Sequence, residues 1–173
     1  MRTTSIARKI KLAGQGDREA LTELYNELRQ PVYLLAYSIT RSHALTEGIV
    51  QDTFEKLITH SQTYEPTGSA RAWILRIAHN TAIDYLRREN RNVELGDSIV
   101  DHLDDYAEVE SDLDFLKATA ALSDRDKSIA VFKVFSGLTH VEIAEALDMT
   151  EGAVRVRYRR ILKQLRRFYR SKD

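Results

Sequence analysis

Apolar residues recur every three or four positions along most of the chain, which is the spacing of amphipathic α-helices. The pattern predicts helices over roughly 17–29, 32–40, 43–60, 70–90, 109–121, 124–135, 140–147 and 151–168. Two prolines, seven glycines and few β-branched runs also favour helix, and neither Pro31 nor Pro66 interrupts a predicted helix. The sequence therefore predicts an all-α fold.

The chain carries no net charge, but its charges fall into three blocks. Residues 1–91 hold 13 basic and 10 acidic residues, residues 92–121 hold 1 and 9, and residues 122–173 hold 12 and 7. Because residues 92–108 also lack clear periodicity, we interpret them as an acidic linker between two small helical domains, 1–91 and 109–173. The linker is either a solvated tether or a segment that mimics nucleic acid or docks on a basic surface. The basic, acidic, basic layout favours a polyanion as partner.

Composition argues against several functional classes. The 173 residues include no cysteine, which excludes disulfides, thiolate metal sites and cysteine nucleophiles. The five histidines show no ligand spacing and no Gly-rich phosphate loop is present, so we expect neither metal nor cofactor and no enzymatic activity. The N-terminus lacks the apolar stretch of a secretory signal, and no charge-free run is long enough for membrane insertion. We therefore expect a cytoplasmic protein.

A helix-turn-helix is predicted near the C-terminus. Thr139 and Glu142 form a T-x-x-E capping box at the start of a short helix, and a second helix follows after about three residues. That second helix has one apolar sector, and arginines fill the opposite side with Val156 among them. In a DNA major groove Val156 could contact a thymine methyl group while Arg155 and Arg159 reach base edges or phosphates. The alternative is a solvated amphipathic helix.

The segment SARAWILRIAHNTAIDYLRREN (69–90) predicts a helix with a face beyond its core face. Trp73 lies on that face among arginine and amide side chains, a combination that suits stacking on an unpaired base. The alternative is a packed Trp73, because a lone tryptophan more often belongs to the core. The preceding loop TYEPTGS offers Tyr64, Thr67 and Ser69 as base contacts.

A third stretch, TEGIVQDTFEKLI (46–58), predicts an amphipathic helix with Phe54 available to the core. Its outward face carries Glu47, Gln51, Asp52 and Glu55. Such a face is either simply solvated or a surface that docks another protein.

The chain resembles the extracytoplasmic-function (ECF) sigma factors, the minimal two-domain sigma-70-type initiation subunits of bacterial RNA polymerase. Three blocks carry the resemblance: GIVQDTFEKL, AWILRIAHNTAIDYLRR and LTHVEIAEALDMTEGAVRVRYRRILKQL. It implies a transcription initiation factor that binds core RNA polymerase, at the β′ clamp and β flap, and directs it to promoter DNA. Because the family often uses inhibitors, it also implies an anti-sigma factor as a further partner. An autonomous helix-turn-helix transcriptional regulator is the alternative.

The resemblance also implies roles for individual residues. Polymerase binding falls on Glu47, Gln51, Asp52, Phe54 and Glu55. Reading of the −10 element falls on Tyr64, Thr67, Ser69, Trp73, Arg76, Asn80 and Arg87, and reading of the −35 element on Arg155, Val156, Arg159 and Arg160. The acidic box that usually precedes the glutamine is reduced here to LTEG, with Glu47 as its one remaining acid.

Overall fold

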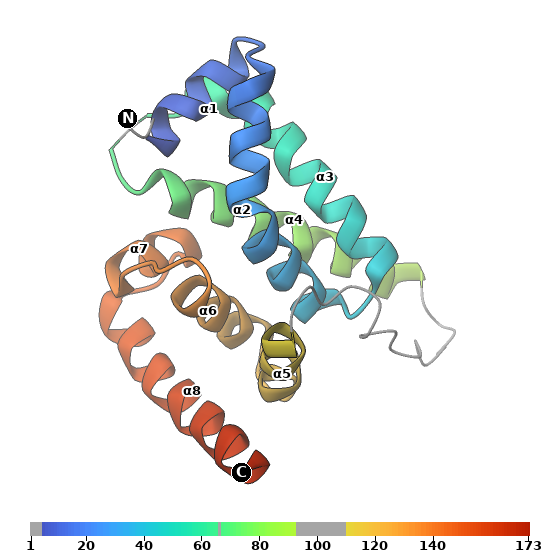
Figure 1. Cartoon of the computed structure of the whole chain (residues 1–173), viewed down its shortest axis with the longest axis vertical. Coiled ribbons are helices and arrows are strands. Elements are labelled where there is room, and N and C mark those ends of the chain that lie inside the picture. The colour runs from blue at the N-terminus through green and yellow to red at the C-terminus, as the bar shows by residue number, and fades with distance from the viewer. Residues whose placement is uncertain (1–4, 66, 93–109) are drawn as a thin grey trace.

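Eight α-helices and one short 3-10 helix make up the described part of this computed structural model, which comprises residues 5–65, 67–92 and 110–173 (Figure 1). In chain order they are α1 (Ile6–Gly14), α2 (Arg18–Thr40), α3 (His43–His60), η1 (Ser61–Thr63), α4 (Ala70–Asn92), α5 (Glu110–Thr119), α6 (Asp124–Val134), α7 (His140–Leu147) and α8 (Glu151–Lys172). These ranges contain no strand, and the prediction of an all-α fold is confirmed.

Side-chain caps begin most of these helices at the residues that the sequence offers for this purpose. The side-chain oxygen of each cap accepts a hydrogen bond from a backbone N–H in the first turn, at Ser5, Asp17, Ser42, Ser123, Thr139 and Thr150. The capping box is complete, with both of its hydrogen bonds at 3.2 Å between Thr139 and Glu142. Helix α7 ends at Leu147, and its C-cap residue Asp148 has a left-handed conformation. Helix α8 begins three residues after Asp148, which gives the predicted helix-turn-helix.

Helices α1 to α4 share one apolar core around α2, which packs on the other three. The fully buried side chains of this shared core include Leu24, Leu28, Leu35, Ile49, Leu57, Ile74 and Leu75. Helix α1 approaches η1 so closely that a Cβ added at Gly14 would lie 1.9 Å from Ser61 Oγ. A larger residue at position 14 would therefore require Ser61 or α1 to move. Helix α1 thus packs closely against this core.

The predicted helices 17–29 and 32–40 form one continuous helix, so their separation is wrong, and α1 lies before residue 17, where no helix was predicted. Helix α2 runs through Pro31, which is buried. A proline inside a helix removes one hydrogen bond and costs about 3 kcal/mol. Leu28, Val32 and Leu35 bury one continuous apolar face on both sides of it, and this burial outweighs the local cost.

Helices α5 to α8 form a second core in which α8 packs on α5, α6 and α7. Phe132, Ile143, Val154 and Ile161 are fully or almost fully buried there. An ion pair of 2.9 Å between Arg157 and Asp126 also joins α8 to α6. The basic helix α8 is therefore fixed along one side by the rest of this group.

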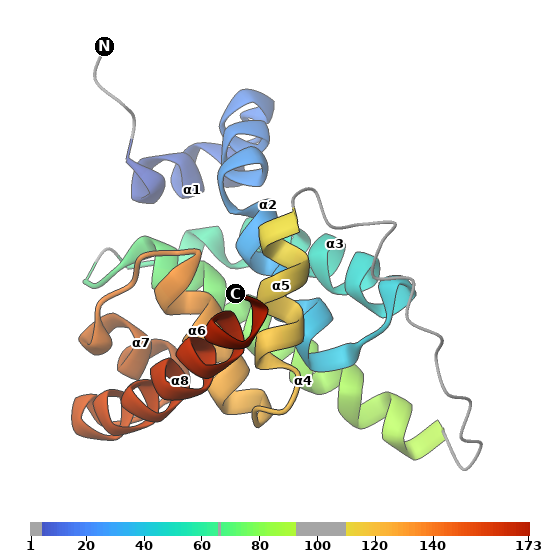
Figure 2. The ribbon, with the colours of Figure 1, turned by 60° about the horizontal axis from the view of Figure 1, so that its bottom comes forward.

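The two groups of helices lie against each other in both views (Figures 1 and 2), with α6 on α2 and α7 on α4. His79 Nδ1 of α4 lies 2.9 Å from Ser128 Oγ of α6, and the Gln30 amide donates to the Asp112 carboxylate at 3.2 Å. Apart from Asn92, which ends α4, the predicted linker 92–108 lies outside the described residues.

Candidate nucleic-acid and polymerase interfaces

The second helix of the helix-turn-helix, α8, presents an open basic face. Arg155, Arg159 and Arg160 are exposed, and Val156 among them is 57% exposed. Arg155 forms an ion pair of 2.7 Å with Glu151 one turn earlier in the same helix. The structure therefore brings together the four residues predicted to read the −35 element, with the apolar side chain in the middle of the cationic ones.

Arg157 lies in the same arginine-rich stretch but has a different place. It is half-buried against α6 through its ion pair with Asp126. The ammonium group of Lys133 lies 5.8 Å from the ring centroid of Tyr158, which adds a second polar contact along this side. These contacts orient α8, so the arginines on its free face project from a fixed helix.

The residues predicted to read the −10 element lie along α4 and the loop before it. Ser69 Oγ caps α4 by accepting from the Ala72 N–H at 3.1 Å. Trp73 is half-buried and packs on Tyr64, with ring centroids 4.8 Å apart. Tyr64 is only 7% exposed, and burial raises the pKa of its hydroxyl. In this conformation Tyr64 supports the Trp73 ring and does not present its own ring to solvent.

Two further residues of the −10 set, Asn80 and Arg87, are exposed farther along α4, and Thr67 is exposed in the loop. Asn80 and Arg87 line a groove together with Arg125 of α6 and Asp148 after α7. The set is thus divided between an open C-terminal part of α4 and an N-terminal part, around Trp73, that lies beside α7.

Helix α7 lies over the N-terminal part of α4. Arg76 of α4 donates to the Glu145 carbonyl oxygen at 3.1 Å and forms an ion pair of 3.0 Å with Asp148. A small pocket between the helices is lined by Tyr64, Trp73 and Arg76 on one side and by Glu145 and Ala146 on the other. Sequence reasoning did not predict this contact, because it depends on how the two helical groups pack.

The residues predicted to bind polymerase divide into two sets on α3. Glu47, Gln51 and Glu55 are exposed, and Gln51 donates to Glu55 at 3.2 Å. Phe54 is only 7% exposed and packs on the half-exposed ring of Tyr25, with centroids 5.0 Å apart. The outward face of α3 is therefore a polar surface beside an aromatic pair, and Tyr25 is a member of it that sequence reasoning missed.

Asp52 has an internal partner. Its carboxylate accepts a hydrogen bond from the Tyr85 hydroxyl of α4, and this bond, with burial, raises the pKa of Tyr85 to about 12. A Cβ at Gly48 would lie 3.1 Å from the Tyr85 hydroxyl oxygen, which is tighter than ordinary contact. The structure thus explains why glycine stands at position 48 in LTEG: the absence of a side chain leaves room for Tyr85 to reach Asp52.

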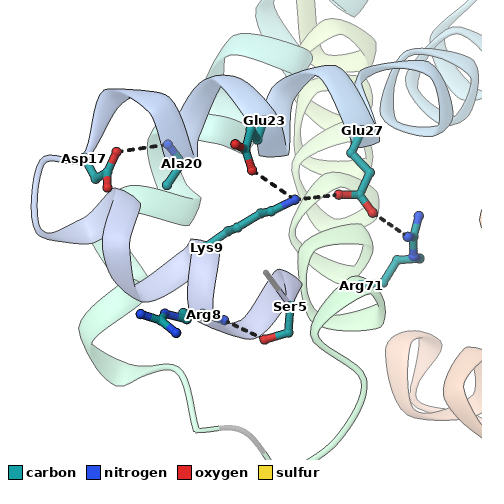
Figure 3. Close-up of polar contacts among 8 residues, drawn as sticks. All are labelled: Ser5, Arg8, Lys9, Asp17, Ala20, Glu23, Glu27 and Arg71. Atoms are coloured by element: carbon teal, nitrogen blue, oxygen red, sulfur yellow. Dashed lines mark hydrogen bonds and ion pairs between the residues drawn. The ribbon is translucent and has the colours of Figure 1, made fainter. Parts of the chain in front are cut away.

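A charged network anchors α1 and the start of α4 to α2 (Figure 3). Lys9, only 7% exposed, forms ion pairs with Glu23 at 3.2 Å and Glu27 at 3.4 Å, and Arg71 joins Glu27 at 2.8 Å. The sequence does not reveal this network, because Glu27 and Arg71 lie 44 positions apart and each reads as an ordinary surface charge.

Comparison with known proteins agrees with this architecture. The model of sigma-70 region 2 matches residues 24–92, and that of sigma-70 region 4 matches residues 112–165, so the two together span most of the chain. The ECF RNA polymerase sigma factor SigK of Mycolicibacterium vanbaalenii is 26% identical over 175 residues, covering 95% of this chain and 89% of SigK. The chain belongs to the ECF sigma factors of the sigma-70 family.

Further relatives extend the match. RNA polymerase sigma factor SigV of Bacillus subtilis is 28% identical over 153 residues, covering 88% of this chain and 92% of SigV. Among solved structures, CnrH in complex with the cytosolic domain of CnrY has a TM-score of 0.69 at 20% identity, covering 96% of this chain and 98% of CnrH. RpoE of Bartonella quintana, solved with the anti-sigma factor NepR, has a TM-score of 0.70 at 23% identity, covering 86% and 95%.

Membership of the ECF sigma factors establishes the activity of this chain. An ECF sigma factor binds RNA polymerase and directs it to promoters, and it is not an enzyme. The matched range of region 2 begins at residue 24, inside α2, so α1 and its anchor Lys9 lie outside it. Within the described ranges, no helix combines the length and apolar character needed to cross a bilayer.

The internal role of Asp52 leads to a prediction about stability. Asp52→Ala removes the acceptor of this hydrogen bond, and Tyr85→Phe removes its donor. Because a hydrogen bond to a charged group contributes about 1.5–3 kcal/mol, a double-mutant cycle measured by urea unfolding should show a coupling of that size. Gln51→Ala, on the exposed side of α3, should change the free energy of unfolding by less than about 0.5 kcal/mol. Additive effects of the two substitutions would show that Asp52 does not serve Tyr85.

Proposed function

We propose that this sigma factor divides promoter reading between two helical domains, residues 1–91 and 109–173, joined by the acidic segment 92–108. The first domain reads the −10 element through α4, and the second reads the −35 element through α8. The observation that carries the proposal is the open face of α8, where Val156 is 57% exposed among Arg155, Arg159 and Arg160. A β-branched apolar side chain gains nothing from water there but fits a thymine methyl group in the major groove.

The −10 assignment is supported by the single tryptophan of the chain. Trp73 lies at the start of α4 with Tyr64 packed on its ring and with Arg76 one turn later. An aromatic ring held in place beside a cation is a platform on which an unpaired base stacks. Asn80 and Arg87 continue this face, and the loop adds Thr67 and Ser69. Tyr64 supports Trp73 in this arrangement, so its own contact with a base requires movement of the loop.

Polymerase binding is proposed for the outward face of α3. Glu47, Gln51 and Glu55 supply its polar part, and Phe54 with Tyr25 supplies an aromatic edge. Asp52 contributes by holding α3 against α4 through Tyr85. We assign this face of α3 to the β′ clamp and the second domain, residues 109–173, to the β flap, the two contacts that the family resemblance implies.

The cellular location and an inhibitory partner are proposed on the same basis. We place the protein in the cytoplasm, where polymerase and promoter DNA are found. CnrH and RpoE were solved with CnrY and NepR, and on that likeness of fold we propose an anti-sigma factor as a further partner of this chain.

The docking surface can be tested by charge reversal. Glu47→Lys with Glu55→Lys should weaken binding to core RNA polymerase and slow association, because charges at an interface act mainly on the association rate. Glu19→Lys, an exposed reversal in the first turn of α2, is the matched control and should leave the affinity unchanged. Equal affinities for all variants, with folding intact, would return this face of α3 to an ordinary solvated surface.

The assignment of α8 is tested with the chain bound to core RNA polymerase, first by the appearance of promoter-specific transcripts. Arg155→Ala or Arg159→Ala should then cost about 1–3 kcal/mol at the preferred −35 sequence and flatten discrimination there. Arg166→Ala or Arg170→Ala should weaken binding to all sequences alike and reduce the salt slope by about one unit for each phosphate that is no longer neutralised.

Val156→Ser gives the sharpest comparison in this series, because it removes no charge. It should reduce the preference at one thymine-bearing position and leave binding to other sequences unchanged. Equal weakening on scrambled −35 sequences for the Arg155, Arg159 and Val156 variants would mean that α8 provides only electrostatic attraction.

A further inference from the structure

Three residues of α7 and its C-cap form an acidic edge along the side that meets α4: Glu142, Glu145 and Asp148. They are spaced three positions apart, so they follow one side of the helix. Each of them meets α4 or the loop before it at a residue that the proposed function assigns to the −10 element. A helix-turn-helix contacts phosphates with cations and neutral donors, and carboxylates repel phosphates. The acidic edge is therefore unsuited to contact DNA itself.

The first contact of the acidic edge is at the start of α4. A hydrogen bond from the Ser69 hydroxyl is the main cause that lowers the pKa of the Glu142 carboxyl, and the charge of Arg71 lowers it further. Glu142 thus places a carboxylate beside Ser69, the residue that caps α4. A helix start with a hydroxyl and an arginine nearby is also where proteins bind phosphate groups.

The remaining contacts lie one turn further along each helix. Glu145 Oε2 would be 3.1 Å from a Cβ added at Gly68, so its side chain covers the loop. Arg76 donates to the Glu145 carbonyl oxygen at 3.1 Å and to the Asp148 carboxylate at 3.0 Å. Oxygen acceptors of Glu145 and Asp148 therefore occupy the donors of Arg76, and Trp73 lies in the same shared pocket as Ser69 and Arg76.

We propose that the acidic edge of α7 is an internal substitute for a DNA strand, which covers the −10-reading face of α4 in the free chain and must leave before that face can bind DNA. The inference rests on the assignment of α4 to the −10 element. The −35-reading face of α8 stays open in the same conformation, so the closure affects only one of the two promoter contacts.

The contacts are suited to a reversible closure. The side chains of Arg76 and Asp148 are 42% and 78% exposed, and an ion pair as exposed as this one is weak. Neutralising one acid should therefore shift the balance between closed and open chains by about two- to five-fold and leave each helical group folded.

The first experiment uses two substitutions that preserve local structure. Glu142→Gln keeps the capping box, which accepts glutamine, and Asp148→Asn keeps a residue that tolerates the left-handed conformation at φ 52°. Trp73 is the only tryptophan, so quenching of its fluorescence by acrylamide reports how well α7 covers α4. The double variant should be quenched more readily than the natural chain, and Glu19→Gln, the matched change of charge on α2, should not. Equal quenching in all three chains would overturn the proposal.

The second experiment exploits the absence of cysteine from the chain. Gly68→Cys with Glu145→Cys introduces two thiols across the contact, and mild oxidation of the free full-length chain should link them. A single-stranded DNA of random sequence should slow this disulfide formation several-fold, because it competes with α7 for the same face. A disulfide that does not form, or that forms at the same rate at every DNA concentration, would overturn the proposal.

The two claims fail separately in these tests. If α4 were not the −10 reader but α7 did cover it, the disulfide would form and DNA would not slow it. If the natural chain gave no promoter-specific transcripts with core polymerase, the proposed function would fail whatever the quenching of Trp73 showed.

Discussion

Helix α4 must satisfy two sets of partners at once, and the rest of the structure is organised around this constraint. One side packs Ile74, Leu75 and Ala78 into the core with α2 and α3. Another side carries Trp73 and Arg76, which suit nucleic acid and here meet α7. A helix that packs in the core on one side and is proposed to bind DNA on another cannot tilt freely. The network of Lys9, Glu27 and Arg71 at one end and the Asp52–Tyr85 hydrogen bond farther along hold it in place.

The proposed division of promoter recognition between two small domains has a physical rationale. A single helix-turn-helix module buries only about 600–1,000 Å² on DNA, which leaves little margin over non-specific binding. Two modules held by one polymerase gain from each other through effective concentration, provided that both can engage at once. A free chain in which α7 covers the proposed −10-reading face would lack this gain. Coverage of α4 by α7 would therefore favour promoter binding by the polymerase-bound sigma factor over binding by the free one.

The sequence predicts the helices and the helix-turn-helix well, because caps and apolar periodicity are local signals. The capping box at Thr139 and the boundaries of α3 and α7 are examples. It fails where packing decides: α2 continues through Pro31, and α1 is anchored by a lysine that reads as a surface charge. The same holds for the site. Residue types place Arg155 and Val156 on an open face, but no local pattern reveals that Asp52 is engaged by Tyr85 or Arg76 by α7.

The separation of the two helical groups tests this account most directly. Neither His60, at the end of α3, nor Lys163, on α8, has a buried side chain, so fluorescent labels on His60→Cys and Lys163→Cys should leave both groups folded. Energy transfer between the labels should be high in the free chain, where α6 and α7 lie on α2 and α4. It should fall when core RNA polymerase and promoter DNA are added, because α4 and α8 must then reach separate elements. Transfer that stays unchanged in the promoter complex would contradict the account, since the face of α4 would still be covered.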